Sequence, residues 1–194
     1  MKLDEDEYIE ETLEGIELSG ETLDEVRFDG CTLEGWSAAE ATLRKCAFDD
    51  CVFRGCDLSN AKLFDTRLRG VRFERCKLMG VDFAAAYALG LDVSFDGCVL
   101  SYASFAGMAL RELQLIECRA HETIFEDADL RKAVFTQSDL RGARFNGTDL
   151  READLSEASG YGIDPTLTKV MGTKMSIEGA IAVAQVLGIE VPNL

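Results

Sequence analysis

The chain has 194 residues, of which 47% are hydrophobic, and this suits a single domain with an ample core. Its 36 acidic side chains outnumber its 20 Lys and Arg residues, so the formal net charge of −16 argues against direct binding to nucleic acid. No apolar run of about 18 residues occurs and the amino terminus is acidic, so the sequence supports neither a membrane span nor secretion, and we expect a cytoplasmic protein.

Residues 1–12 are expected to form an acidic lead-in to the rest of the chain. Residues 1–40 contain 14 acidic and 2 basic side chains, whereas residues 41–100 contain 8 acidic and 9 basic side chains. The negative charge is therefore concentrated near the amino terminus, and the centre of the chain is close to neutral.

Residues 13–158 repeat with a period of five. Leu or Phe occupies 26 of the 28 positions at this spacing, and Ala38 and Ala120 occupy the other two. The position two residues earlier is small or β-branched almost throughout, and Trp36 fills it where Ala38 replaces the large residue. Neither a helix nor simple strand alternation keeps this period, so we expect short strand-and-turn units that bury one large and one small side chain and must stack. A two-residue insertion near residues 89–94 shifts the register.

Several pentads carry a recognisable pattern. Ala-Asp-Leu-Arg-Lys at 128–132, Ser-Asp-Leu-Arg-Gly at 138–142 and Ala-Asp-Leu-Ser-Glu at 153–157 resemble the pentapeptide-repeat family, whose consensus is A(D/N)LXX. The resemblance implies an all-β solenoid, a right-handed quadrilateral β-helix in which four pentads make one coil of about twenty residues. About seven coils at about 4.8 Å each are expected. A hexapeptide β-helix is the rival fold, and the five-residue period argues against it.

Coils of this length would stack one group of acidic side chains on a single side. This row contains the candidate partner-binding residues Glu14, Glu34, Glu74 and Asp96, together with Arg54. Carboxylates at strand spacing repel one another, so stability alone would not select such a row. Another side carries the opposite bias, in Arg69, Arg111, Arg131 and Arg151. The alternative interpretation is that these charges only keep the surface soluble.

We expect no catalytic residue, cofactor or metal. All seven cysteines lie at the small position of a pentad, and Cys56, Cys76, Cys98 and Cys118 would form one ladder. Such a ladder could bind a soft metal, but strand spacing of about 4.8 Å is too wide for a tetrahedral cage, which favours small apolar filler. The single histidine, His121, has no evident nucleophile beside it, so a surface role is favoured over that of a general base.

Residues 159–194 are expected to cap the solenoid and to form a dimer. A breaker segment at 159–165 precedes a helix at about 177–187, with Ser176 as N-cap and Gly188 as the residue that ends it. The residues expected at a dimer interface are Ile177, Ile181, Ala184, Leu187, Ile189 and Val191. A monomeric cap is the alternative.

The repeat, breaker, helix and Gly-Ile-Glu-Val ending together resemble the branch of the family that protects type II topoisomerases. This branch includes Qnr-type quinolone-resistance proteins and the self-immunity proteins of albicidin and microcin producers. The resemblance implies a non-catalytic, DNA-mimicking homodimer that engages DNA gyrase or topoisomerase IV. Unlike several Qnr-type relatives, this chain has no long inserted loop. The competing interpretation is a solenoid scaffold for an unrelated protein partner.

Overall fold

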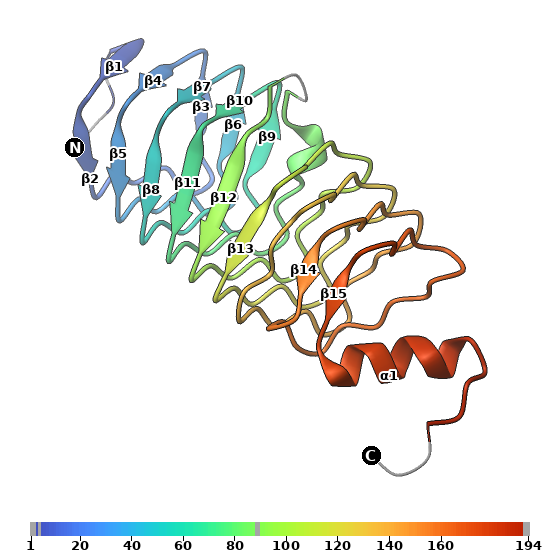
Figure 1. The fold of residues 1–194 in the computed structure, drawn as a ribbon. Helices are drawn as coiled ribbons and strands as arrows, with labels where there is room; N and C mark the ends of the chain where they lie inside the picture. The colour runs from blue at the N-terminus through green and yellow to red at the C-terminus, as the bar shows by residue number, and fades with distance from the viewer. Residues whose placement is uncertain (1–2, 4, 88–89, 192–194) are drawn as a thin grey trace.

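The computed structural model describes residues 3, 5–87 and 90–191. The chain forms a right-handed, four-sided parallel β-solenoid of about eight turns that ends in one short helix (Figure 1). The fold class predicted from the sequence is thereby confirmed. The rod is longer than the expected seven coils because strands also form before and after the range of the Leu and Phe repeat.

Each side of the rod is a stack of short strands that pair in parallel with the coils before and after. The first side contains β1 (Glu7–Ile9), β4 (Arg27–Asp29), β7 (Ala47–Asp49) and β10 (Arg67–Arg69). The second side contains β2 (Thr12–Glu14), β5 (Thr32–Glu34), β8 (Val52–Arg54), β11 (Val71–Glu74), β12 (Val93–Asp96) and β13 (Gln114–Ile116). Farther along the chain, β14 (Asp154–Leu155) pairs with β15 (Lys174–Met175).

The third side is held by single parallel bridges that begin with Glu17 to Ser37 and Ser37 to Asp57. The fourth side contains β3 (Thr22–Asp24), β6 (Thr42–Arg44) and β9 (Lys62–Phe64), followed by the short 3-10 helix η1 (Phe83–Ala85). Strands of three or so residues follow from the pentad, because the chain must turn a corner after every five residues.

The large residue of each pentad points into the rod and stacks on its counterpart one coil away. Phe28 and Phe48 lie 4.8 Å apart between ring centroids, and their rings are nearly parallel. Phe73 and Phe95 stack in the same way at 5.3 Å. Ten of the 11 phenylalanines are buried, and Phe64, which lies off the five-residue spacing, is 48% exposed. The interior is therefore a continuous column of aromatic and aliphatic side chains.

Where the small residue of a pentad is Cys, Ser or Thr, its side chain also makes a hydrogen bond. The Cys56 thiol donates to the carbonyl of Leu33 at 3.2 Å, and the Thr66 hydroxyl donates to the carbonyl of Leu43 at 2.9 Å. All seven cysteines are buried and unoxidised, and burial raises the pKa of the Cys51 thiol to about 12. The prediction of small apolar filler described their size but missed this bond, which explains why Cys, Ser and Thr share the position.

The register changes once. Phe73 pairs with Phe95, whereas neighbouring coils elsewhere pair residues twenty apart, as Phe53 does with Phe73. The extra residues fall between η1 and β12, where Ala88 and Leu89 lie outside the described residues. Because the same shift applies to both the large and the small positions, Cys76 and Cys98 stay neighbours, with the Cys76 amide 3.4 Å from the Cys98 sulfur.

Both ends of the solenoid extend past residues 13–158. At the amino end, β1 lies within the expected lead-in and Tyr8 stacks on Phe28 at 5.3 Å. At the carboxyl end, β15 adds a further coil before helix α1 (Ile177–Val186). The helix confirms the element expected at 177–187, and the Ser176 hydroxyl caps it by accepting from the Gly179 amide at 3.1 Å.

Candidate partner-binding surfaces

The four carboxylates expected in one row lie on the second side, each at the last residue of a strand. Glu14 pairs with Glu34 across β2 and β5, and Glu74 pairs with Asp96 across β11 and β12. Strand spacing of about 4.8 Å brings each pair close enough to repel. Among the described residues, Glu14, Glu34 and Asp96 make no ion pair.

Arg54 interrupts this row. It lies between Glu34 and Glu74 in the register, and its Nε is 2.9 Å from a carboxylate oxygen of Glu74. The row therefore consists of two carboxylate pairs with a cation between them, and Glu74 is partly neutralised. This pair is exposed, so it contributes little to stability and Arg54 remains able to exchange partners.

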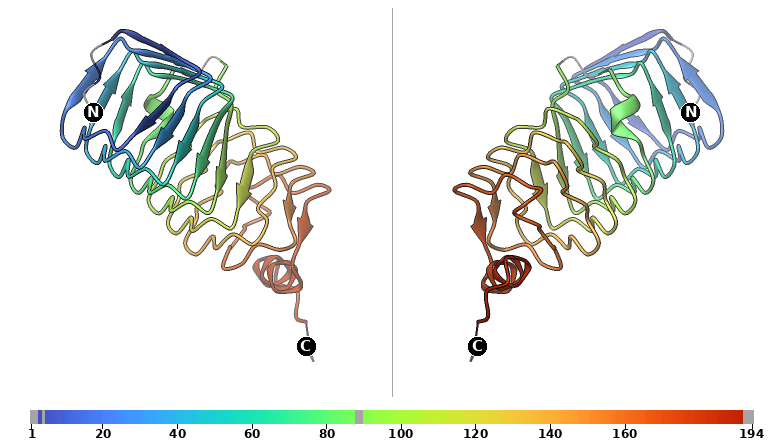
Figure 2. Two further views of the ribbon diagram at one scale, coloured as in Figure 1. Left: turned by 90° about the vertical axis from the view of Figure 1, so that its left-hand side faces the viewer. Right: turned by 90° about the vertical axis from the view of Figure 1, so that its right-hand side faces the viewer.

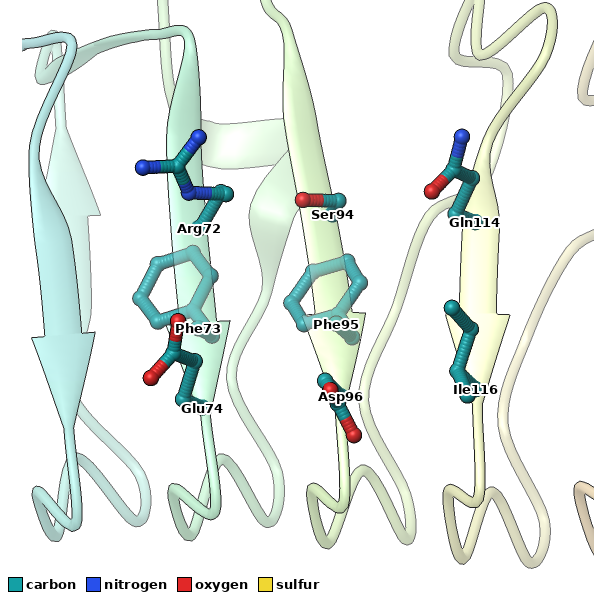
Figure 3. A pocket seen from close by; sticks show the side chains of 8 residues that line it. All are labelled: Arg72, Phe73, Glu74, Ser94, Phe95, Asp96, Gln114 and Ile116. Carbon is teal, nitrogen blue, oxygen red and sulfur yellow. The ribbon is translucent and has the colours of Figure 1, made fainter.

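A shallow depression lies at the Glu74 and Asp96 pair. Figure 3 shows Glu74, Asp96 and Ile116 in one row, and Arg72, Ser94 and Gln114 in the row beside it. The rings of Phe73 and Phe95 point away from this surface into the core. The depression arises because short Ser94 and Asp96 lie between longer neighbours, so hydrogen-bonding side chains surround a shallow hollow on this face.

The arginines expected to make another side basic are neutralised locally. Arg131 and Arg151 each make two hydrogen bonds to the aspartate two residues earlier, at 2.7 and 2.8 Å. Arg111 also contacts Asp129 at 2.8 Å. Paired in this way, the arginines form an ordered ladder with little net charge.

His121 lies on the third side next to Asp139 and Arg141. Its Nε2 is 2.8 Å from a carboxylate oxygen of Asp139, and Arg141 makes further hydrogen bonds to the same carboxylate. Arg141 first and His121 second hold the pKa of Asp139 down to about 2. The histidine therefore takes part in a surface charge cluster.

Helix α1 packs on the solenoid through a small residue and a valine. Gly179 is buried against the Tyr161 ring and Val183 packs on the core, while Ile177 is 72% exposed and Leu187 is 53% exposed. The Tyr161 hydroxyl holds the start of the helix by accepting from the Ser176 amide at 2.9 Å. Small Gly179 allows this close approach, a signal that a search for large apolar residues overlooks.

The carboxyl end exposes apolar side chains on the helix, on the tail after it and on the last coil. Of the residues expected at a dimer interface, Ile181 and Ala184 are half-buried and the others are exposed. The exposed apolar residues at this end are Leu167, Met171, Ile177, Val186, Leu187, Ile189 and Val191. Leu167 and Met171 were not anticipated, because the Leu and Phe repeat ends before the breaker and the further coil places other apolar residues at its large positions.

The family model for pentapeptide repeat regions matches residues 21–87 and 91–161, which is more than half of the chain. The chain belongs to the pentapeptide-repeat family. The gap between the two matched segments coincides with the register change, as expected if the two extra residues interrupt an otherwise regular repeat.

Solved pentapeptide-repeat proteins share the fold over nearly the whole chain. Full-length QnrB1, a plasmid-mediated fluoroquinolone resistance protein, matches with a TM-score of 0.64 at 19% identity, covering 94% of this chain and 100% of QnrB1. A trypsin-treated QnrB1 variant matches with a TM-score of 0.54 at 26% identity, covering 95% of this chain and 89% of that one. A search of curated protein sequences finds no significant match. In the described residues, no helix is long and apolar enough to cross a membrane.

Proposed function

We propose that this pentapeptide-repeat protein is a cytoplasmic, non-catalytic protector of DNA gyrase or topoisomerase IV, which it engages by presenting carboxylates where the enzyme would bind DNA phosphates. The observation that carries the proposal is the row of Glu14, Glu34, Glu74 and Asp96 along one side of a straight rod. Regularly spaced negative charge on a rigid rod is complementary to a surface built for duplex DNA.

Two features support protection of an enzyme over catalysis by this chain. Side chains fill the rod along its axis. The depressions on its surface are therefore shallow, unlike the enclosed clefts in which enzymes bind small molecules. The likeness to QnrB1 covers both chains almost completely, and QnrB1 is a fluoroquinolone resistance protein.

We further propose that two copies associate through the carboxyl end. Ile177, Leu187 and Ile189 are exposed on or just after the helix that packs on the last coil. Exposed apolar residues gathered at one end favour protein association, and their burial would join two rods end to end. The doubled length would present a carboxylate row on each arm.

The test is a DNA supercoiling assay with purified gyrase and a quinolone, an albicidin-like or a microcin-like poison. The wild-type protein should restore supercoiling against at least one of them. A variant with Glu14, Glu34, Glu74 and Asp96 all changed to Lys should lose this protection while keeping its fold. A matched control changes four exposed acidic residues on the other sides to Lys, namely Glu40, Asp65, Glu112 and Glu122.

Equal protection by both variants would refute the role of the row, and absence of protection by the wild type would refute the function. A solenoid scaffold for an unrelated protein is the second candidate, favoured by Arg54 within the row and by the near-neutral central coils. Under that function, gyrase supercoiling would respond to none of the variants. If the gene for this protein lies next to a biosynthetic gene cluster for a topoisomerase poison, self-immunity is favoured over the scaffold.

A further inference from the structure

The first coil breaks the pentad rule on its inward side. In the coils that follow it along the chain, the small position is filled by buried residues such as Val26, Cys31 and Ala41. In the first coil, three of the four small positions hold exposed Asp6, Glu11 and Glu21, and Ile16 alone is buried. Their carbonyls still accept hydrogen bonds from the next coil, as Glu11 does from the Thr32 amide at 2.8 Å. The backbone is therefore in register, and only the side chains depart from the rule.

The same coil is an open edge of the solenoid. Among the residues that the structure describes, strands β1, β2 and β3 each pair with one neighbour only, and each is the terminal strand of its sheet. The Thr32 and Thr42 amides donate toward the preceding coil, so by the same geometry the Thr12 and Thr22 amides point out of the amino-terminal end. Figure 2 shows the first turns at one end of the rod and α1 at the other.

The open edge is surrounded by carboxylates. Residues 5–25 contain ten acidic side chains and no basic one. In the described part of the chain, only Asp24 and Glu25 among them make ion pairs, with Arg44 and Lys45 of the next coil. The remaining charges are unpaired and lie on several sides of the rod, as Glu7, Glu14 and Glu17 do.

The shape of the edge selects the partner that could pair with it. Each edge strand offers three residues before the chain turns a corner, so an extended peptide could pair with one short segment only. A second coil of the same outline could pair with every side at once. Exposed edges of this kind are templates for association, and solenoids need polar terminal repeats to remain soluble.

We propose that the carboxylates of the first coil are an electrostatic cap that keeps this open edge from pairing with the same edge of a second copy. Two identical ends that approach each other bring like charges together around the whole outline, and this repulsion opposes backbone pairing. The cap goes beyond the proposed function and does not rest on it. Much of the net negative charge then has a purpose separate from DNA mimicry.

The test is sedimentation velocity of a variant with Glu10, Glu11, Glu17 and Glu21 changed to Gln. Glu14 is left unchanged because it belongs to the carboxylate row. In about 20 mM salt the variant should associate at least about tenfold more tightly than the wild type, beyond any mass due to the carboxyl end. In about 1 M salt, where the Debye length is about 3 Å, the wild type should approach the variant.

A matched control removes the same charge elsewhere, by changing Glu112, Glu117, Glu152 and Glu157 to Gln. These residues are also exposed, and the control should sediment as the wild type does. Hydrogen exchange then locates the contact, since association of the variant should slow exchange at the Thr12 and Thr22 amides and leave that of α1 unchanged.

Adding Thr12→Pro to the Gln variant provides an independent check. Proline removes an N–H that points out of the edge and places its ring there, while the β2–β5 pairing needs no donor from this position. This variant should lose the added association. The cap is refuted if the Gln variant sediments as the wild type does at every salt concentration, if the control associates equally, or if protection appears at α1 instead.

Discussion

The exchange of large and small residues within one pentad offers a sharp test of how the core is built. Trp36 occupies the small position and Ala38 the large one, and both are buried. The Trp36 ring makes edge contacts with Phe28 at 5.7 Å and Phe53 at 6.4 Å. Its Nε1–H donates to the Leu13 carbonyl at 2.8 Å, the same bond that a cysteine thiol makes in the coils above.

The magnitudes follow from these contacts. Trp36→Cys keeps a donor for the Leu13 carbonyl but leaves a cavity, and should lower the free energy of unfolding by about 3 to 5 kcal/mol. Ala38→Leu adds volume next to the indole and should cost about 1 to 3 kcal/mol. Together the two changes restore the usual pentad, so the double variant should be more stable than Trp36→Cys alone, with a coupling of at least about 2 kcal/mol.

Urea denaturation followed by circular dichroism measures these free energies, with the midpoint compared at equal slope. Trp36 is the single tryptophan of the chain, so its fluorescence is lost in the Trp36→Cys variants. The circular dichroism of the backbone still follows unfolding in every variant. A double variant that loses the full sum of the two single costs would refute the reasoning. It would mean that the two residues fill separate spaces, contrary to the shared pentad.

Further predictions concern the thiols, acid stability and the helix. Because burial raises the pKa of the Cys51 thiol to about 12, Cys51 should resist a thiol reagent at pH 8 until urea unfolds the chain, and rapid labelling of the native protein would contradict its burial. The pKa of Asp154 is lowered to about 2, first by Ser156 and then by a lysine of the next coil, so its stabilisation is present above about pH 4 and is lost as the pH falls toward 2. Asp154→Asn should therefore reduce the loss of stability in that range, and an unchanged slope would exclude this role. Gly179→Ala would normally favour a helix by about 1 kcal/mol, yet here it should lower the melting temperature and weaken dimerisation because the new methyl meets Tyr161; a stabilised dimer would refute the docking geometry.

The body of the fold could be predicted from the sequence because the pentad specifies both what is buried and how often the chain turns. Leu and Phe at every fifth residue are sufficient to fix the sides and the register. The ends were harder to predict because their residues differ from the rule. Tyr8, Val170 and Met175 keep the twenty-residue spacing from Phe28, Leu150 and Leu155, but they are neither Leu nor Phe. Widening the large position to any apolar residue would have located both end coils.

The candidate surfaces were predictable in position and less so in detail. The stacking of Glu14, Glu34, Glu74 and Asp96 follows from counting, whereas the ion pair of Arg54 with Glu74 depends on side-chain geometry. The buried face of α1 could not be predicted from apolar spacing because its closest contact is made by a glycine. Tertiary contact with Tyr161, fixed by chain far from the helix, decides the orientation.

Competition between this protein and DNA for gyrase tests the central claim most directly. Binding of the labelled protein to purified gyrase can be measured by fluorescence anisotropy at increasing concentrations of linear duplex DNA. If the carboxylate row occupies the DNA-binding surface, the apparent dissociation constant should rise in proportion to DNA concentration, and the four-Lys variant should not bind. Undiminished binding to gyrase that is saturated with DNA would contradict the claim.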